Sequence, residues 1–169
     1  MNIDLNSFDR EKAIDQMLAA DAVDLELENA RVDRPIAVKG EVIKASEGVK
    51  LLGRMSGSLG IDCDRCLESV ERSFDIELDL AFAPSEQLEG EANIELRAED
   101  MKLDAIEGSQ IDLVQIAIEQ ILLDLPQQFF CRIDCKGLCE KCGTNLNLKD
   151  CDCGDDEIDP RWAALHRLN

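Results

Sequence analysis

The sequence predicts an α+β fold, an antiparallel β-sheet or partly open barrel packed by one central apolar helix. The prediction adds a cysteine-rich C-terminal segment and short terminal helices. Three observations lead to it. Apolar and polar residues alternate in stretches between Val23 and Ala83, which is the period of half-buried strands. A single long run has apolar residues at helical spacing, and most of the cysteines gather near the C-terminus.

Three stretches carry the strand pattern. The clearest is Phe74–Phe82, in which every second residue is apolar and acidic residues stand between several of them. Ile36–Ile43 and Val49–Asp62 alternate in the same way. Because glycine in a strand often marks a bend or a bulge, the glycines of Val49–Asp62 predict irregular pairing there: Gly53, Gly57 and Gly60.

Helices are expected at both ends of the sheet region. A short helix is predicted over Ser7–Ala22, from the spacing of Phe8, Ile14, Met17 and Leu18. After a short strand near Met101–Ile106, the central helix is expected to begin with Ser109 as N-cap and to stop at Pro126. Its apolar stripe is wide enough to cover a sheet. The stripe consists of Ile111, Val114, Ile118, Ile121, Leu122 and Leu125, with Leu113, Ile116 and Ala117 beside them.

The chain divides into two predicted domains. Residues 1–128 form the core of sheet and helix, and residues 129–169 form a cysteine-rich segment that ends in a short helix. In that last helix, Asp159 is the expected N-cap and Pro160 stands at the first helical position. A length of 169 residues fits one domain with a small appendage.

The net charge and the N-terminal sequence limit the kinds of function that the protein can have. The formal net charge is −19, which disfavours bulk attraction to a polyphosphate and suits a basic partner such as a ribosomal protein. The N-terminus lacks the basic and apolar regions of a secretory signal, and no apolar run approaches a membrane span. We therefore expect a cytoplasmic protein without a membrane partner. Disulfides rarely persist in a reducing cytosol, so eight cysteines there indicate metal or redox chemistry.

The eight cysteines form four closely spaced pairs, typical of zinc ligation by thiolates. Cys139 and Cys142, followed by Gly143, read as half of a zinc knuckle. One arrangement places a structural zinc on Cys139, Cys142, Cys151 and Cys153, and a second site on Cys63, Cys66, Cys131 and Cys135. In a rival arrangement, Cys131 or Cys135 replaces Cys151 in the first site. The spacing alone does not choose between these arrangements.

Other cysteine chemistries fit the sequence less well. Cys135, Cys139 and Cys142 have the spacing of a radical S-adenosylmethionine cluster, but the 27 residues after Cys142 cannot build the barrel that follows such a cluster. A redox Cys-x2-Cys opens a helix, whereas the run "GTNLN" after Cys142 predicts a turn. A redox-responsive zinc-binding chaperone remains as the alternative function.

Signs of catalysis are sparse. His166 is the only histidine, and the sequence has no phosphate-binding glycine loop, so we expect a non-enzymatic protein with no small-molecule substrate. Two stretches are less acidic than the rest, Arg31–Arg54 and Cys131–Gly154. They are where direct RNA contact would occur, although the sequence favours solvated strand edges and turns as their explanation.

Four motifs occur in order along the chain: "CDRCLE", the helix ending "ILLDLP", "CKGLCEKCGTNLN" with "CDC", and "DPRWAAL". Together they resemble the YceD family, described as large ribosomal RNA subunit accumulation proteins. The resemblance implies a factor that supports normal levels of 23S-type ribosomal RNA, with a large-subunit ribosomal protein or pre-ribosomal particle as partner. It carries the family's "CxRC" motif onto Cys63 and Cys66. The C-terminal motif falls on Cys135, Cys139, Cys142, Cys151 and Cys153.

Overall fold

The computed structural model describes residues 1–45, 48–84, 103–106 and 108–153. The largest structural unit among them is a six-stranded sheet in the order β2-β4-β5-β6-β7, with β3 beside β5. The sheet is open, because its end strands β2 and β7 do not pair with each other within the described ranges. Its strands are β2 (Glu11–Leu18), β3 (Ala30–Val32), β4 (Ile36–Ala45), β5 (Gly48–Asp62), β6 (Ser69–Pro84) and β7 (Leu103–Ile106).

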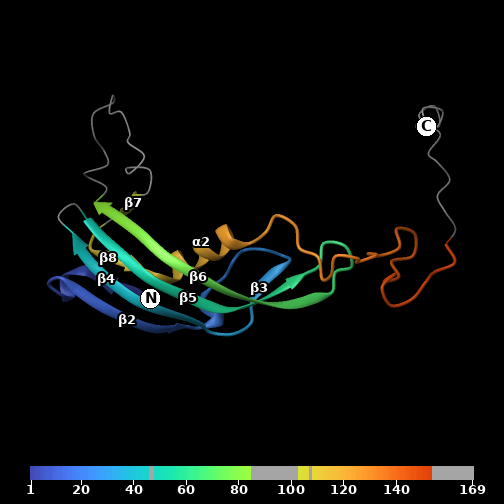
Figure 1. The fold of residues 1–169 in the computed structure, drawn as a ribbon, viewed down its shortest axis with the longest axis horizontal. Helices are drawn as coiled ribbons and strands as arrows, with labels where there is room; N and C mark the ends of the chain where they lie inside the picture. Colours follow the sequence, from blue (N-terminus) through green and yellow to red (C-terminus); the bar gives the residue numbers. More distant parts are fainter. Residues whose placement is uncertain (46–47, 85–102, 107, 154–169) are drawn as a thin grey trace, which may run out of the picture.

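The remaining elements lie on one side of this sheet (Figure 1). Strand β1 (Asn2–Asp4) pairs antiparallel with β8 (Gln110–Asp112), and β8 leads directly into the helix α2 (Leu113–Asp124). Two short 3-10 turns flank β2, η1 (Leu5–Ser7) and η2 (Ala20–Ala22). The protein is therefore mostly β-sheet with one α-helix among the described residues. None of the helices described there is long and apolar enough to cross a membrane.

The two longest strands, β5 and β6, form one long hairpin in the middle of the sheet. Its antiparallel register runs without interruption from Val49 opposite Phe82 to Asp62 opposite Ser69. The predicted alternation of Phe74–Phe82 is confirmed, since its apolar residues are buried or half-buried on the helix side while Asp75 and the acids beyond it are exposed. This hairpin carries the Cys63–Cys66 turn at its far end (Figure 1).

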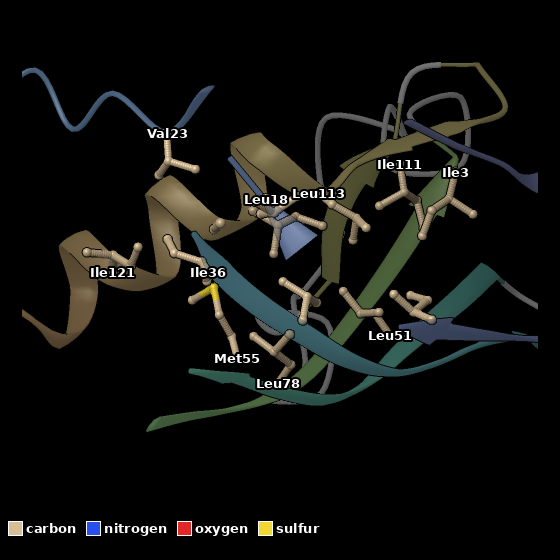
Figure 2. Close-up of a cluster of buried hydrophobic side chains, with 14 of the residues drawn as sticks. Ile3, Leu18, Val23, Ile36, Leu51, Met55, Leu78, Ile111, Leu113 and Ile121 are labelled. Atoms are coloured by element: carbon tan, nitrogen blue, oxygen red, sulfur yellow. The ribbon is translucent and has the colours of Figure 1, made fainter. Parts of the chain in front are cut away.

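The hydrophobic core lies between the sheet and α2. Figure 2 shows side chains from β2, β4, β5 and β6 pointing toward those of the helix. The helix contributes its buried residues Leu113, Ile116, Ala117 and Ile121. The most deeply buried large side chains of the sheet are Leu18, Ile36, Val42, Leu51 and Met55.

The glycines of β5 do not form the predicted bulges, because its pairing with both neighbours is continuous. Gly53 stands opposite Gly40 of β4, and the two strands approach closely there. A Cβ added at Gly53 would lie 2.3 Å from the Lys39 carbonyl oxygen, and one at Gly40 only 2.1 Å from that of Leu52. These two glycines are required by the closeness of the backbones.

The predicted helix over Ser7–Ala22 is wrong. Residues Glu11–Leu18 form β2, which pairs with β4 along its whole length. Ile14 and Leu18 are buried four positions apart, a spacing that satisfies both a helix and a strand of period two, while Met17 is exposed. Tertiary pairing with β4 decides in favour of the strand.

The start of the central helix is also corrected. Ser109 is not its N-cap, because Gln110–Asp112 are drawn into β8 by pairing with β1. Asp112 caps the helix instead, its carboxylate accepting a hydrogen bond of 2.9 Å from the Val114 N–H. The expected strand near Met101–Ile106 is confirmed as β7 over Leu103–Ile106. The predicted C-terminal helix after Asp159 lies outside the described residues.

Candidate metal centres

The eight cysteines come together in two groups of four. We call Cys63, Cys66, Cys131 and Cys135 the inner cluster, and Cys139, Cys142, Cys151 and Cys153 the outer cluster. In each cluster all four Sγ atoms lie within 4.8 Å of one another. Each is a set of four thiols that can hold one metal ion.

The first half of the inner cluster is the turn between β5 and β6. Cys63 N–H donates to the Glu68 carbonyl oxygen at 2.9 Å, and Leu67 N–H donates to that of Cys63, also at 2.9 Å. These bonds curl the chain around Cys63 and Cys66, which are 0% and 4% exposed. Since the turn continues two paired strands, the sheet fixes the position of both sulfurs.

The second half, Cys131 and Cys135, follows α2 and is tied to the first. Asp64 N–H donates to the Phe129 carbonyl oxygen at 2.9 Å, and Phe129 N–H returns a bond of 2.7 Å to the Asp64 carboxylate. Arg65 donates from Nη1 to the Cys135 carbonyl oxygen at 3.0 Å, with its guanidinium 4.2 Å from the centre of the Phe130 ring. These contacts hold the Cys63–Cys66 turn against the Cys131–Cys135 segment, although the two are distant in sequence.

The inner cluster fits a tetrahedral metal. Zinc bonded to sulfur at about 2.3 Å places neighbouring sulfurs about 3.8 Å apart. The Sγ atoms of Cys63 and Cys135 are 3.8 Å apart, and those of Cys66 and Cys131 are 3.6 Å apart. All four thiols are free. These contacts are much longer than a disulfide bond of about 2 Å and match two opposite edges of the tetrahedron.

The surroundings shift the pKa values of the inner cysteines in opposite directions. Burial raises the pKa of Cys63, but the backbone groups of Cys131, Arg65 and Cys66 outweigh it and bring the pKa down to about 6. Burial and the neighbouring thiols raise the pKa of Cys131 to about 12. These shifts favour the thiolate of Cys63 over that of Cys131.

The outer cluster is built on a small hairpin. Cys139 N–H donates to the Thr144 carbonyl oxygen and Gly143 N–H donates to that of Cys139, both at 2.8 Å. Gly143 takes a positive φ of 69°, which closes the turn after Cys142 as the sequence predicted. Cys151 and Cys153 complete the group from the chain that follows.

The outer cluster is more open than the inner one. Cys142 and Cys153 are exposed, and Cys139 and Cys151 are half-buried. Hydrogen bonding to the side chain and backbone of Thr144 lowers the pKa of Cys142 to about 6. The nearby Cys142 sulfur, together with desolvation, raises the pKa of Cys153 to about 12.

The two clusters group the cysteines as in the first of the predicted arrangements. The rival arrangement is not seen, because Cys151, and not Cys131 or Cys135, lies beside Cys139. That these residues ligate metal remains a prediction. Sequence reasoning missed two residues that contact Cys135. Arg65 donates a hydrogen bond to its carbonyl oxygen, and Asn147 donates one to its sulfur. Their only signal was position, Arg65 inside the first cysteine pair and Asn147 in the run "TNLN".

Comparison with known proteins identifies the family. Residues 51–169, which include all eight cysteines, match the model of the large ribosomal RNA subunit accumulation protein YceD. This chain belongs to the YceD family. It is 28% identical over 156 residues to an Arabidopsis thaliana protein named large ribosomal RNA subunit accumulation protein YCED homolog 1, chloroplastic, covering 79% of this chain and 48% of that protein.

Two bacterial relatives extend the comparison. An uncharacterized protein of Mycobacterium tuberculosis is 33% identical over 124 residues, which is 73% of this chain and 57% of that protein. The uncharacterized protein YlbN of Bacillus subtilis is 29% identical over 137 residues, 79% of this chain and 74% of the relative. The chain thus spans about half the length of the mycobacterial and plant YceD relatives. No solved structure matches it.

Proposed function

We propose that this protein is a non-enzymatic, cytoplasmic ribosome biogenesis factor that supports accumulation of large-subunit ribosomal RNA. The family match over residues 51–169 carries the proposal. Within it, the two cysteine clusters hold structural zinc and the acidic sheet surface receives a basic partner. That partner is a large-subunit ribosomal protein, alone or within a pre-ribosomal particle.

Structural zinc is supported by the donor sets. Four thiolates without an open ligand position are typical of closed structural zinc sites, although the same donors also hold iron–sulfur clusters. Bound there, the metal supplies a four-way cross-link. The protein supplies the ligands and their positions, from the β5–β6 turn, the segment after α2 and the outer hairpin. Elemental analysis of the purified chain should give two zinc ions per molecule. Iron, or no metal at all, contradicts the assignment.

The basic partner is supported by charge on the outer face of the sheet. On β6, the exposed residues of that face include four acids: Glu71, Asp75, Glu77 and Asp79. Arg34 lies 3.5 Å from Glu71 and Arg54 lies 3.1 Å from Asp75. Within the described part of the chain, Glu77 and Asp79 form no ion pair. These two acids without an ion-pair partner there, on a chain of net charge −19, attract and orient a cationic surface.

The test joins a physical readout to a cellular one. The tagged protein should capture a large-subunit ribosomal protein from lysate at moderate salt, and deletion of its gene should lower 23S-type ribosomal RNA. Glu77→Lys with Asp79→Lys should weaken capture at least tenfold, whereas Asp21→Lys with Glu28→Lys, exposed acids elsewhere, should not. Wild-type ribosomal RNA after deletion, with no large-subunit component captured, refutes the proposal.

A redox-responsive zinc chaperone is the second candidate, and exposure of the outer cluster favours it. Cys142 is exposed and its pKa is lowered to about 6, which is the setting of an oxidisable thiol. Peroxide should then release zinc and increase protection of an unfolding client protein from aggregation. Retention of zinc with unchanged protection rejects this function. Direct RNA contact is a weaker idea, because the thiolates add negative charge to the same segment.

A further inference from the structure

The hairpin that carries the outer cluster is attached to the inner cluster. Leu138 N–H donates to the Arg65 carbonyl oxygen at 3.1 Å, and Leu146 N–H donates to that of Gly137 at 2.9 Å, closing the hairpin stem. Gly137 has a φ of 77°, and a Cβ there would lie 3.1 Å from the Arg65 carbonyl oxygen. The stem therefore rests on the backbone of the inner Cys63–Cys66 turn.

Asn147 makes a second attachment, through its side-chain amide. Oδ1 accepts hydrogen bonds from the Lys136 N–H at 2.8 Å and from Arg132 Nη2 at 2.7 Å. Since both of those groups can only donate, the oxygen faces them and the amide nitrogen faces the sulfur. Nδ2 lies 3.3 Å from Cys135 Sγ and also donates to Asn145 Oδ1 at 2.9 Å. Asn147 stands between two outer ligands in sequence, yet its amide bonds an inner one.

The two clusters are anchored to the rest of the chain in different ways. The inner cluster is anchored by the β5–β6 turn and by the Asp64–Phe129 pair, neither of which involves the outer hairpin. The outer cluster has its hairpin stem on Arg65 and its last two ligands on the chain after Asn147. Cys151 is four positions after Asn147, a reach of at most about 14 Å, so the position of Asn147 limits where Cys151 can lie.

We propose that the two clusters bind zinc in order, the inner cluster first, and that Asn147 transmits occupancy of the inner cluster to the outer one. The inference rests on the zinc sites proposed above. When the inner site is filled, Cys135 is a fixed thiolate and a strong acceptor for the Asn147 N–H. Asn147 then holds the stem and the approach to Cys151 in place, which raises the affinity of the outer site.

A site-resolved zinc titration tests the order. The zinc-loaded chain is titrated with a chelator, thiols are alkylated, and each cysteine is mapped by mass spectrometry, with rates in metal-free protein correcting for exposure. The outer four cysteines should become reactive at lower chelator concentration than the inner four. In Asn147→Ala, which keeps all eight thiols, release of the outer zinc should need about tenfold less chelator. Asn6→Ala, an exposed asparagine in η1, should behave as wild type.

Two double variants separate the sites. Cys151→Ser with Cys153→Ser should keep one zinc with the first-step affinity of wild type, within about threefold. Cys63→Ser with Cys66→Ser should leave an outer site about tenfold weaker than the second step of wild type; if that variant does not fold, Asn147→Ala decides. Simultaneous release of all eight thiols, or an unchanged outer site in Asn147→Ala, overturns the ordered loading. Fewer than two zinc ions in wild type instead refutes the zinc sites themselves.

Discussion

The sheet and the cysteine-rich segment, residues 131–153, are stabilised by different means. The sheet and α2 share one cluster of buried apolar side chains. In the segment, by contrast, Ile133 and Leu148 are 99% and 76% exposed, and Cys135 is its only buried side chain. The segment is ordered by hydrogen bonds and thiols instead of an apolar core. One chain can therefore contain a region that folds by burying hydrocarbon and a region that needs cross-links.

Removal of metal should produce the largest difference between the two regions. A strong chelator at neutral pH should abolish amide protection over residues 131–153 and leave that of β4, β5 and β6 in place. A structural zinc site contributes on the order of 10 kcal/mol or more of apparent binding free energy, which the segment cannot replace. Hydrogen exchange followed by mass spectrometry measures this, and zinc added back should restore protection. Protection that survives without metal would show that the segment is stable by itself.

The stability of the apolar core between the sheet and α2 should instead depend on the packing of its side chains. Ile121→Ala removes a side chain that is 1% exposed and should lower the free energy of unfolding by about 2–5 kcal/mol in urea titration. Leu123→Ala changes a neighbouring side chain of the same helix that is 78% exposed, so it should cost less than about 0.5 kcal/mol. Zinc content should stay constant in both variants. Equal costs would place α2 elsewhere than against the sheet.

Arg65 joins the two regions, so its removal should have an intermediate effect. Arg65→Ala deletes the bond to the Cys135 carbonyl oxygen and the contact with Phe130, at a cost of about 1–3 kcal/mol. Hydrogen exchange should accelerate around Cys135 and not in β2. Arg72→Ala, an exposed arginine on β6, is the matched control. An identical effect of both variants would mean that only net charge matters.

The smallest effect is expected at the helix cap. Asp112→Ala should cost about 1 kcal/mol, whereas Asp112→Asn, also a good cap, should cost less. Partial burial raises the pKa of Asp112, but the Val114 N–H and the Met1 amino group outweigh it and lower the pKa below 3.8. Its charge thus stabilises the fold above the unfolded pKa, and this contribution is lost as pH falls through the lowered folded pKa. Wild type and Asp112→Asn should therefore begin to converge in thermal stability as pH falls below about 4, and converge fully only below the lowered pKa of Asp112. A constant difference at all pH values would exclude the charge as its cause.

The alternation of apolar and polar residues predicted β4, β5 and β6. It did not predict which strands pair with each other. The alternation in Phe74–Phe82 fixes which side chains face the helix, because side chains of a strand point to opposite faces. The same reasoning failed at Glu11–Leu18, where a four-residue spacing fits two periods and pairing with β4 decides. Spacing likewise identified the four cysteine pairs. Which pairs meet depends on the long β5–β6 hairpin ending beside the chain that follows α2, and no local signal encodes that.

A zinc ion in the inner cluster, as proposed, would add its binding free energy to the stability of the whole fold, although the sheet would stay folded without it. The reason is the wide sequence separation of the four ligands. Cys66 and Cys131 are 65 positions apart, and Cys63 and Cys135 are 72 apart, with β6 and α2 between them. A ligand that binds only the folded chain adds about 1.4 kcal/mol to the free energy of unfolding for each tenfold rise above its dissociation constant. Free zinc in the cell would then set how much of this protein survives proteolysis. The proposed ribosome biogenesis factor would become scarcer when zinc does.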